Sequence, residues 1–135
     1  MKNFDVQAIL IEAPFGKVFH YIADAQNLIE WTSAFKSVSD GRALLETPNG
    51  QVEIGLKVSQ SFKLGTIDWK MSFPDGSIGV AYSRVLDAGN LGSIYSFVLM
   101  PPPLPLEKVE GTLMQQSEVL KEELNRLRLL LTKKS

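Results

Sequence analysis

The sequence predicts an α+β domain in which a seven-stranded antiparallel sheet wraps around a long C-terminal helix, with two short helices after the first strand. Three observations predict this class. Before residue 35, a strand-like segment precedes apolar residues at helical spacing. Over residues 35–100, apolar residues recur at every second position between regularly spaced turns. Near the C-terminus, leucines recur at helical spacing. With 135 residues the chain has the size of one domain, and we expect residues 1–135 to form a single one.

The segment before residue 35 predicts one strand and two short helices. Residues 4–12 are rich in Val and Ile and partly alternate, as strands do. Pro14 suits the first turn of a helix, because the N–H that it lacks has no partner there. Asp24 can cap a second short helix that contributes Trp31. Apolar residues of the first helix recur at helical spacing, at Phe15, Val18, Phe19 and Ile22.

Turn residues divide the segment from residue 35 to residue 100 into six strands, each joined to its neighbour as in a meander. Asn-Gly and Asp-Gly are strong hairpin signals, because both central residues of a type I′ turn need a positive φ. The expected turns are Asp40-Gly41, Asn49-Gly50, Leu64-Gly65, Asp75-Gly76 and residues 87–90.

These turns also predict a register. A two-residue loop at Asp75-Gly76 places Trp69 opposite Tyr82, and a loop at residues 87–90 places Tyr82 opposite Tyr95. With this register the apolar residues gather on one face, which therefore needs a cover. A few polar groups interrupt that face: Gln60, Tyr82, Arg84, Ser93 and Tyr95.

A C-terminal helix is the expected cover. Five leucines and one serine follow one helical stripe, at Leu113, Ser117, Leu120, Leu124, Leu127 and Leu131. Thr112 and Gln115 have the spacing of a capping box, although the helix could also begin near Leu106 and include Gly111. A coiled coil is the weaker interpretation, because the stripe spans only about three heptads and lacks a partner segment.

Composition excludes several classes of function. Fourteen basic against fifteen acidic residues give a net charge of −1, which argues against a nucleic-acid-binding protein. The absence of cysteine and the single histidine exclude thiolate or multi-histidine metal sites, and no cofactor is expected. The N-terminus lacks the apolar core of a signal peptide, and no apolar run reaches the roughly 18 residues of a membrane span, so the expected compartment is the cytoplasm.

The order of elements resembles the START-like or SRPBCC superfamily, which has the helix-grip fold and includes lipid-transfer domains and polyketide cyclase/dehydrase-like proteins. The likeness covers essentially the whole chain and is carried by short segments in order: Ala13-Pro14 with Val18-Phe19, Trp31, Pro74-Asp75-Gly76, Tyr95-Ser96-Phe97, and Glu123-Leu124 with Leu127. The resemblance implies a hydrophobic ligand between sheet and helix. Some members of that superfamily catalyse cyclisation or hydration there, so the fold does not by itself define the function.

An apolar face with a few polar groups is the usual form of a small-molecule site. Trp69, Tyr82 and Tyr95 are expected to form a row across three strands that could stack on a flat ligand. The alternative is that these aromatic residues are simply core and that Arg84 reaches solvent at the sheet edge. The candidate ligand-binding residues are Trp31, Gln60, Trp69, Met71, Tyr82, Arg84, Tyr95 and Phe97.

The leading interpretation is a non-catalytic binder or carrier of a hydrophobic or aromatic small molecule. The alternative is a cyclase- or dehydratase-type enzyme in which Arg84, Tyr82 or Tyr95 polarises a substrate oxygen, and a polar group with a perturbed pKa inside the pocket would favour it. His20, as the one histidine, is expected to be a solvated surface residue rather than a general base. A third interpretation is an interaction module that binds a partner protein, such as a second copy in a homodimer.

Overall fold

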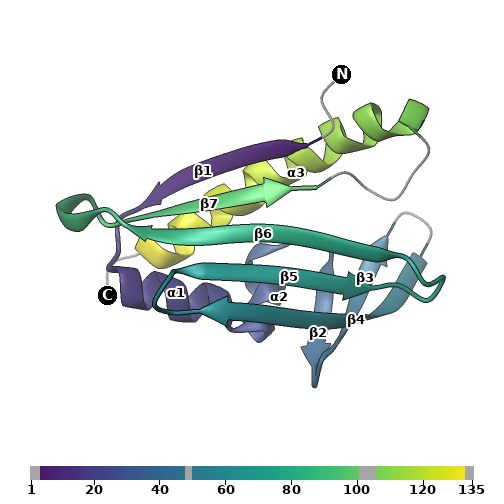
Figure 1. Cartoon of the computed structure of the whole chain (residues 1–135), viewed down its shortest axis with the longest axis horizontal. Helices are drawn as coiled ribbons and strands as arrows, with labels where there is room; N and C mark the ends of the chain where they lie inside the picture. The colour runs from purple at the N-terminus through teal and green to yellow at the C-terminus, as the bar shows by residue number, and fades with distance from the viewer. Residues whose placement is uncertain (1–3, 48–49, 101–105, 133–135) are drawn as a thin grey trace.

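A computed structural model describes residues 4–47, 50–100 and 106–132, without the side chains of 106–112 (Figure 1). Within these residues it confirms the antiparallel sheet of seven strands, the long C-terminal helix and the short helices after the first strand. The strands are β1 (Asp5–Ile11), β2 (Phe35–Ser39), β3 (Arg42–Thr47), β4 (Gly50–Ser61), β5 (Thr66–Ser72), β6 (Ile78–Asp87) and β7 (Ser93–Leu99). The helices are α1 (Phe15–Ala23), the 3₁₀ turn η1 (Ala25–Asn27), α2 (Leu28–Trp31), the 3₁₀ turn η2 (Gly89–Leu91) and α3 (Leu106–Thr132).

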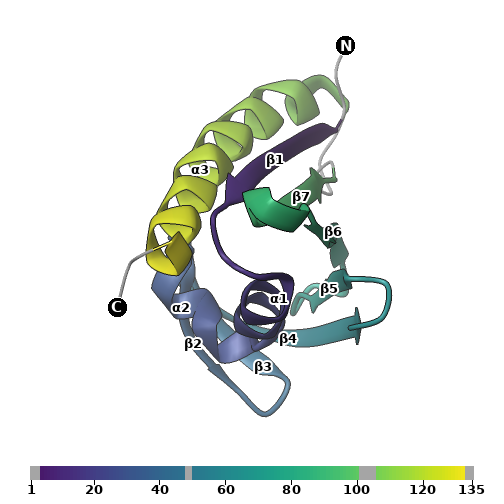
Figure 2. The ribbon, with the colours of Figure 1, turned by 90° about the vertical axis from the view of Figure 1, so that its left-hand side faces the viewer.

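The sheet is an open meander with the first strand added at one edge. Its order is β1-β7-β6-β5-β4-β3-β2, so the last strand pairs with the first, and every pair is antiparallel. Figure 2 shows the strands in an arc, with α1 inside the curve and α3 along the open side beside β1. Helix α3 packs on β1 and on α2, which lies at its C-terminal end. The helices and the concave face of the sheet therefore enclose the interior between them.

The helix boundaries follow the expected signals, with one correction. Helix α1 begins directly after Pro14, and the Asp24 side chain accepts a hydrogen bond from the Gln26 backbone N–H at 3.1 Å at the start of η1. Helix α3 begins at Leu106, the earlier of the two expected starts, so a helix start at Thr112 is wrong. The predicted leucine stripe is buried, at Leu113, Leu120, Leu124, Leu127 and Leu131.

Polar side chains attach α3 to the edge strand β1. The Ser117 hydroxyl donates to Asp5 Oδ2 at 2.6 Å, and Gln7 Nε2 donates to the Ser117 carbonyl oxygen at 2.9 Å. These groups lie at the one polar position of the leucine stripe. Their hydrogen bonds therefore fix the position of α3 along β1 as well as its distance from the strand.

The register on the β2–β5 side of the sheet has the expected faces. Asp40 and Gly41 both have a positive φ, 51° and 76°, as the predicted type I′ turn requires. The β4–β5 pairing differs by two residues from the expected one, so Gln60 lies opposite Ile67 rather than opposite Trp69. A shift of two keeps every side chain on its face. Of the expected Asn49-Gly50 turn, Asn49 lies outside the described residues.

The register of β6 was predicted wrongly on both sides. The β6–β7 loop covers residues 88–92 rather than 87–90, so Tyr82 does not lie opposite Tyr95, and the β5–β6 loop has three residues rather than two. The Gly76 N–H donates to the Phe73 carbonyl oxygen and the Phe73 N–H to the Ser77 carbonyl oxygen, both at 3.0 Å. Pro74 suits the first central position of a type I turn, and Gly76, with a φ of 90°, takes the left-handed position that follows. Trp69 consequently lies opposite Ala81, not Tyr82.

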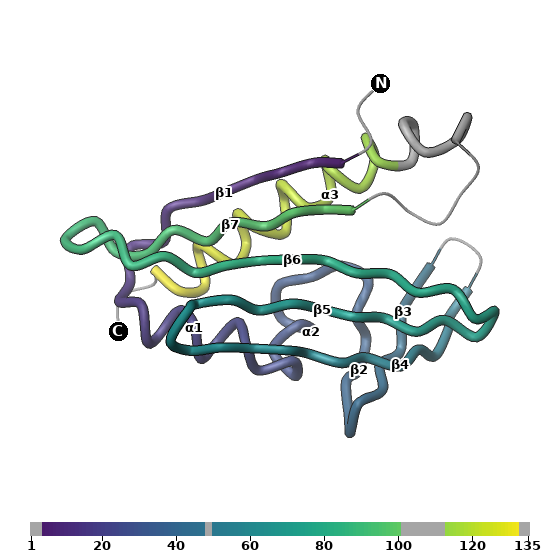
Figure 3. Tube along the Cα trace, in the orientation of Figure 1, coloured from purple at the N-terminus to yellow at the C-terminus, as the bar shows by residue number. Residues whose placement is uncertain are grey.

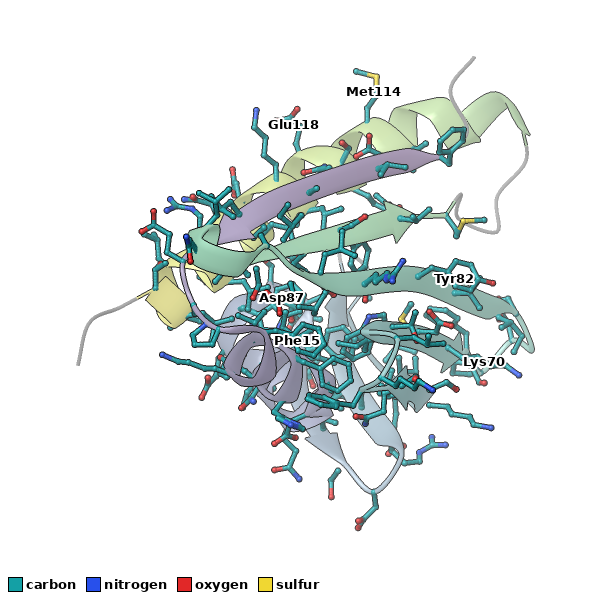
Figure 4. All side chains as sticks on the ribbon, turned by 60° about the vertical axis from the view of Figure 1, so that its left-hand side comes forward. Phe15, Lys70, Tyr82, Asp87, Met114 and Glu118 are labelled. Atoms are coloured by element: carbon teal, nitrogen blue, oxygen red, sulfur yellow. The ribbon has the colours of Figure 1, made fainter. Side chains whose placement is uncertain are left out.

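The one-residue slip exchanges the two faces of β6. Tyr82 lies opposite Asp68 and Val98 on the outer face, where 44% of its surface is exposed. Figure 4 shows Tyr82 and Lys70 together on that outer side. The inner face of β6 instead carries mostly small residues: Gly79, Ala81, Ser83 and Val85.

Candidate functional site

A cavity of about 750 Å³ lies between the concave face of the sheet and α3. Strands β4 to β7 form its floor, the segment from α2 to β2 forms one side, and α3 forms the other. Most of the lining side chains are aromatic or aliphatic, as in small-molecule sites. The lining residues are Leu28, Trp31, Thr32, Ala34, Phe35, Leu56, Trp69, Met71, Ala81, Phe97, Leu99, Gln115, Gln116, Glu118, Val119, Leu120 and Glu123.

The small inner residues of β6 make room for this cavity. Ala81 lines it directly, between Trp69 on β5 and Leu99 on β7. The expected register would have placed Ile78, Val80 and Tyr82 on this face. Because an alanine occupies far less volume than a tyrosine, the observed register leaves space that the expected one would have filled.

Aromatic rings form the end of the cavity nearest α2. Trp31 and Phe97 line it, and Tyr95 lies beside both, with ring centroids 6.4 Å from Trp31 and 6.2 Å from Phe97 in edge-to-face arrangements. Trp69 is held by its indole N–H, which donates to the Ser83 hydroxyl at 3.3 Å, and that hydroxyl donates to the Ile67 carbonyl oxygen at 2.6 Å. The cavity therefore has rigid aromatic surfaces suited to a flat ligand.

The Tyr95 hydroxyl and the Trp31 indole N–H are buried without a hydrogen-bond partner among the described residues. Burial raises the pKa of the Tyr95 hydroxyl, and the nearby Ser83 and Trp69 oppose this increase without completing a hydrogen bond. A phenol in this environment stays neutral at ordinary pH. Tyr95 is absent from the cavity lining, so its hydroxyl does not reach a ligand there.

Glu123 is the ionisable side chain of the cavity wall with a perturbed pKa. Its Oε2 accepts a hydrogen bond from the Ser33 backbone N–H at 2.6 Å, which joins α3 to the segment after α2. Burial raises the pKa of Glu123, while the Ser33 donors and the Arg126 guanidinium act in the opposite direction and Glu122 adds to the rise. Arg126 itself donates to the Trp31 carbonyl oxygen at 3.3 Å.

The predicted site residues divide into two groups. Trp31, Trp69, Met71 and Phe97 line the cavity, and their role in binding a ligand stays a prediction. Tyr95 does not line the cavity but packs against two residues that do, Trp31 and Phe97. The predicted positions of Tyr82 and Arg84 on the concave face are wrong because of the β6 slip. Gln60 is exposed near the end of β4 and does not line the cavity.

Arg84 has a structural partner on the outside. Its Nε donates to the Leu64 carbonyl oxygen at 3.0 Å, and the residue is exposed. A guanidinium in this position supports the β4–β5 loop. It is not available to polarise a substrate oxygen inside the cavity.

Sequence reasoning missed several residues of the wall. Ala81 required the correct register of β6, and Phe35 required the fold of the α2–β2 segment. Leu56 lies on the face of β4 that was predicted correctly but was not named as a site residue. Glu123 could have been named as a candidate, because helical spacing places it on the flank of α3 directly beside the predicted leucine stripe. Gln116, seven residues earlier, lies on the same flank and also lines the cavity.

Other sites are not supported by the described residues. His20 is exposed, as predicted, and stacks on Phe62 with ring centroids 5.0 Å apart. Within the described part of the chain, no group of three or more potential metal ligands is present. None of the helices there has the length and apolar character needed to cross a membrane.

No protein-family model matches the sequence, and no curated protein matches it. Solved structures do resemble the chain. Protein XoxI from Bacillus cereus has a TM-score of 0.70 at 12% identity, with 96% of both chains covered. A START superfamily protein from Mycobacterium smegmatis has a TM-score of 0.63 at 13% identity, covering 96% of this chain and 99% of that one. The Zhui aromatase/cyclase from Streptomyces sp. R1128 has a TM-score of 0.64 at 9% identity, covering 93% and 90%.

At these identities the similarity concerns the fold alone. The sheet order, the short helices after β1 and the long α3 against the concave face agree with it. The chain has the START-like, helix-grip fold that is also found in aromatase/cyclases.

Proposed function

We propose that the protein binds an apolar, aromatic small molecule in the cavity between the sheet and α3. The observation that carries this proposal is the composition of the wall: a cavity of about 750 Å³ lined by Trp31, Phe35, Trp69 and Phe97 together with aliphatic side chains. A cavity of this size holds a ligand of several fused rings, and an apolar wall favours ligand over water. The fold adds general support, because a neighbour of the same fold is an aromatase/cyclase.

A fluorescent neutral probe tests this proposal, for example N-phenyl-naphthylamine titrated into purified protein. We expect saturable enhancement of its fluorescence. Ala81→Leu should weaken probe binding by about tenfold or more, because the added side chain enters the cavity, while the free energy of unfolding changes by less than about 1.5 kcal/mol.

Ala8→Leu is the matched control. Ala8 lies on the outer face of β1 and is exposed, so the same substitution there should leave probe binding unchanged. Native mass spectrometry of gently purified protein, repeated after denaturation, adds a search for a co-purified ligand. Absence of saturable probe binding and of any co-purified molecule would overturn the proposal.

Glu123 favours one second candidate, an enzyme of the cyclase or dehydratase type. A carboxyl group whose pKa is raised by burial can exchange a proton with a bound substrate, as general acid–base catalysis requires. Of the groups first considered for this role, Tyr82 and Arg84 lie outside the cavity and Tyr95 lies behind it. A bound compound whose mass or chromatographic retention changes during incubation with the wild type but not with Glu123→Gln would support the enzyme, and a compound unchanged in both would support a carrier.

A further inference from the structure

The cavity has an uneven distribution of charge. Two lining residues are acidic, Glu118 and Glu123, and none of the described lining residues is basic. Figure 4 shows Glu118 projecting away from the body of the molecule. Glu123 differs, because it is partly buried and its carboxylate reaches the segment between α2 and β2. It is therefore the charge that a ligand in the cavity meets.

Helix geometry places Glu123 beside the ligand space. Gln116, Val119 and Glu123 are spaced by three and four residues, so they form one flank of α3 next to the buried stripe. All three line the cavity. The Ser33 backbone N–H holds Glu123 Oε2 at 2.6 Å and so fixes the orientation of the carboxylate. An ionised carboxylate has roughly four acceptor positions, and Ser33 uses only part of this capacity.

Arg126 is the basic group that acts on Glu123, and its guanidinium also has another partner. Arg126 donates to the Trp31 carbonyl oxygen and does not line the cavity. An anionic head group beside Glu123 would thus place two like charges close together with no basic residue among the described lining residues, which is unfavourable. A protonated amine or a hydroxyl would instead donate a hydrogen bond to the carboxylate.

We propose that the ligand combines an aromatic body with a hydrogen-bond-donating head, a protonated amine or a hydroxyl, and that Glu123 excludes carboxylates. This inference rests on the proposed small-molecule binding. It adds a preference for the head group of the ligand, which an apolar cavity alone does not provide. Gln116 is a further polar group on the same flank of α3.

Three competitors with the same ring system test the selectivity: naphthylmethylamine, naphthylmethanol and naphthoate, each displacing N-phenyl-naphthylamine at neutral pH. We expect the amine and the alcohol to compete at least about tenfold more strongly than the carboxylate. In Glu123→Gln the amine should lose about tenfold and the carboxylate should gain, while the alcohol changes by less than about threefold. A glutamine oxygen still accepts from Ser33, so this variant is expected to fold.

Glu12→Gln controls for the change in net charge. Glu12 is exposed and lies outside the cavity lining, so this variant should reproduce the wild-type order of affinities. Equal affinities for the three competitors, or tightest binding of naphthoate, would overturn the selectivity and leave small-molecule binding intact. Failure of the wild type to bind the probe and all three competitors would overturn both proposals.

Discussion

The concave face of one sheet is solidly packed at one end and hollow at the other. At the packed end, Ile67, Val85 and Tyr95 are fully or almost fully buried near α1. At the open end of the same three strands, Met71, Gly79 and Leu99 are only partly buried. Figure 3 shows that the β4–β5 and β5–β6 turns lie at opposite ends of the sheet, so each strand runs from one region into the other.

The difference arises from the cover and from residue size. Helix α1 fills the packed end with Phe15, Phe19 and their neighbours, and Figure 4 shows Phe15 between α1 and the sheet. At the open end the cavity separates α3 from the strands of its floor, and β6 contributes Gly79 and Ala81. The same alternation of apolar residues thus forms a core in one place and a cavity wall in the other.

The largest expected difference between the two ends concerns truncation of apolar side chains. Ile67→Ala should lower the free energy of unfolding by about 4 kcal/mol, because its side chain is completely buried and leaves a void. Met71→Ala, on the same strand and face, should cost about 1 kcal/mol, because its side chain already borders the cavity. Urea denaturation of both variants measures the two costs, and equal values would contradict the distinction between the ends.

Adding a methyl group should also destabilise the packed end more than the open end, with a smaller difference in the free energy of unfolding. A Cβ at Gly65 would lie 2.2 Å from the Val85 carbonyl oxygen, and the φ of Gly65 is +76°, so Gly65→Ala should cost at least about 2 kcal/mol. A Cβ at Gly79 would lie 3.4 Å from the Phe73 ring. Gly79→Ala should therefore be neutral or stabilise by up to about 1 kcal/mol. Thermal denaturation compares them, and a strongly destabilised Gly79→Ala would show that the open end is tightly packed after all.

The smallest expected effect is at Tyr95, at the packed end. Tyr95→Phe removes a buried hydroxyl that has no partner among the described residues, so the variant should be as stable as the wild type or up to about 1 kcal/mol more stable. Probe binding should stay unchanged, because the hydroxyl does not line the cavity. A loss of 2 kcal/mol or more in urea denaturation, about the cost of breaking a satisfied buried hydrogen bond, would reveal a partner for this group.

Much of the fold could be predicted from local patterns. The leucine stripe of α3, the starts of α1 and η1 after Pro14 and Asp24, and the Asp40-Gly41 turn depend on neighbours in sequence, and all were confirmed. The faces of β4 and β5 were also correct, because errors of two residues in register preserve them.

The candidate site was harder, because it depends on non-local geometry. Pro74 favours a type I turn at residues where Asp-Gly alone predicts a type I′ turn, and the next loop, expected at residues 87–90, was also wrong; together these errors placed Tyr82 and Arg84 on the wrong face. The alternation of apolar residues along a strand predicts which face is buried, but it does not show whether that face packs on a helix or borders a cavity. The environment of Glu123 depends on Ser33, ninety residues away in sequence, and so could not be read from α3 alone.

The three-residue loop Pro74–Gly76 carries a consequence beyond its own hairpin. Side chains alternate along a strand, so what matters is whether the loop holds an odd or an even number of residues, not its length as such. With an even number of loop residues, the side chains of Ile78, Val80 and Tyr82 would point inward and fill the cavity. With the observed odd number, the inward positions are occupied by Gly79 and Ala81 instead. This loop does not line the cavity, yet its residue count helps to determine whether the space under the sheet is filled by side chains or left open.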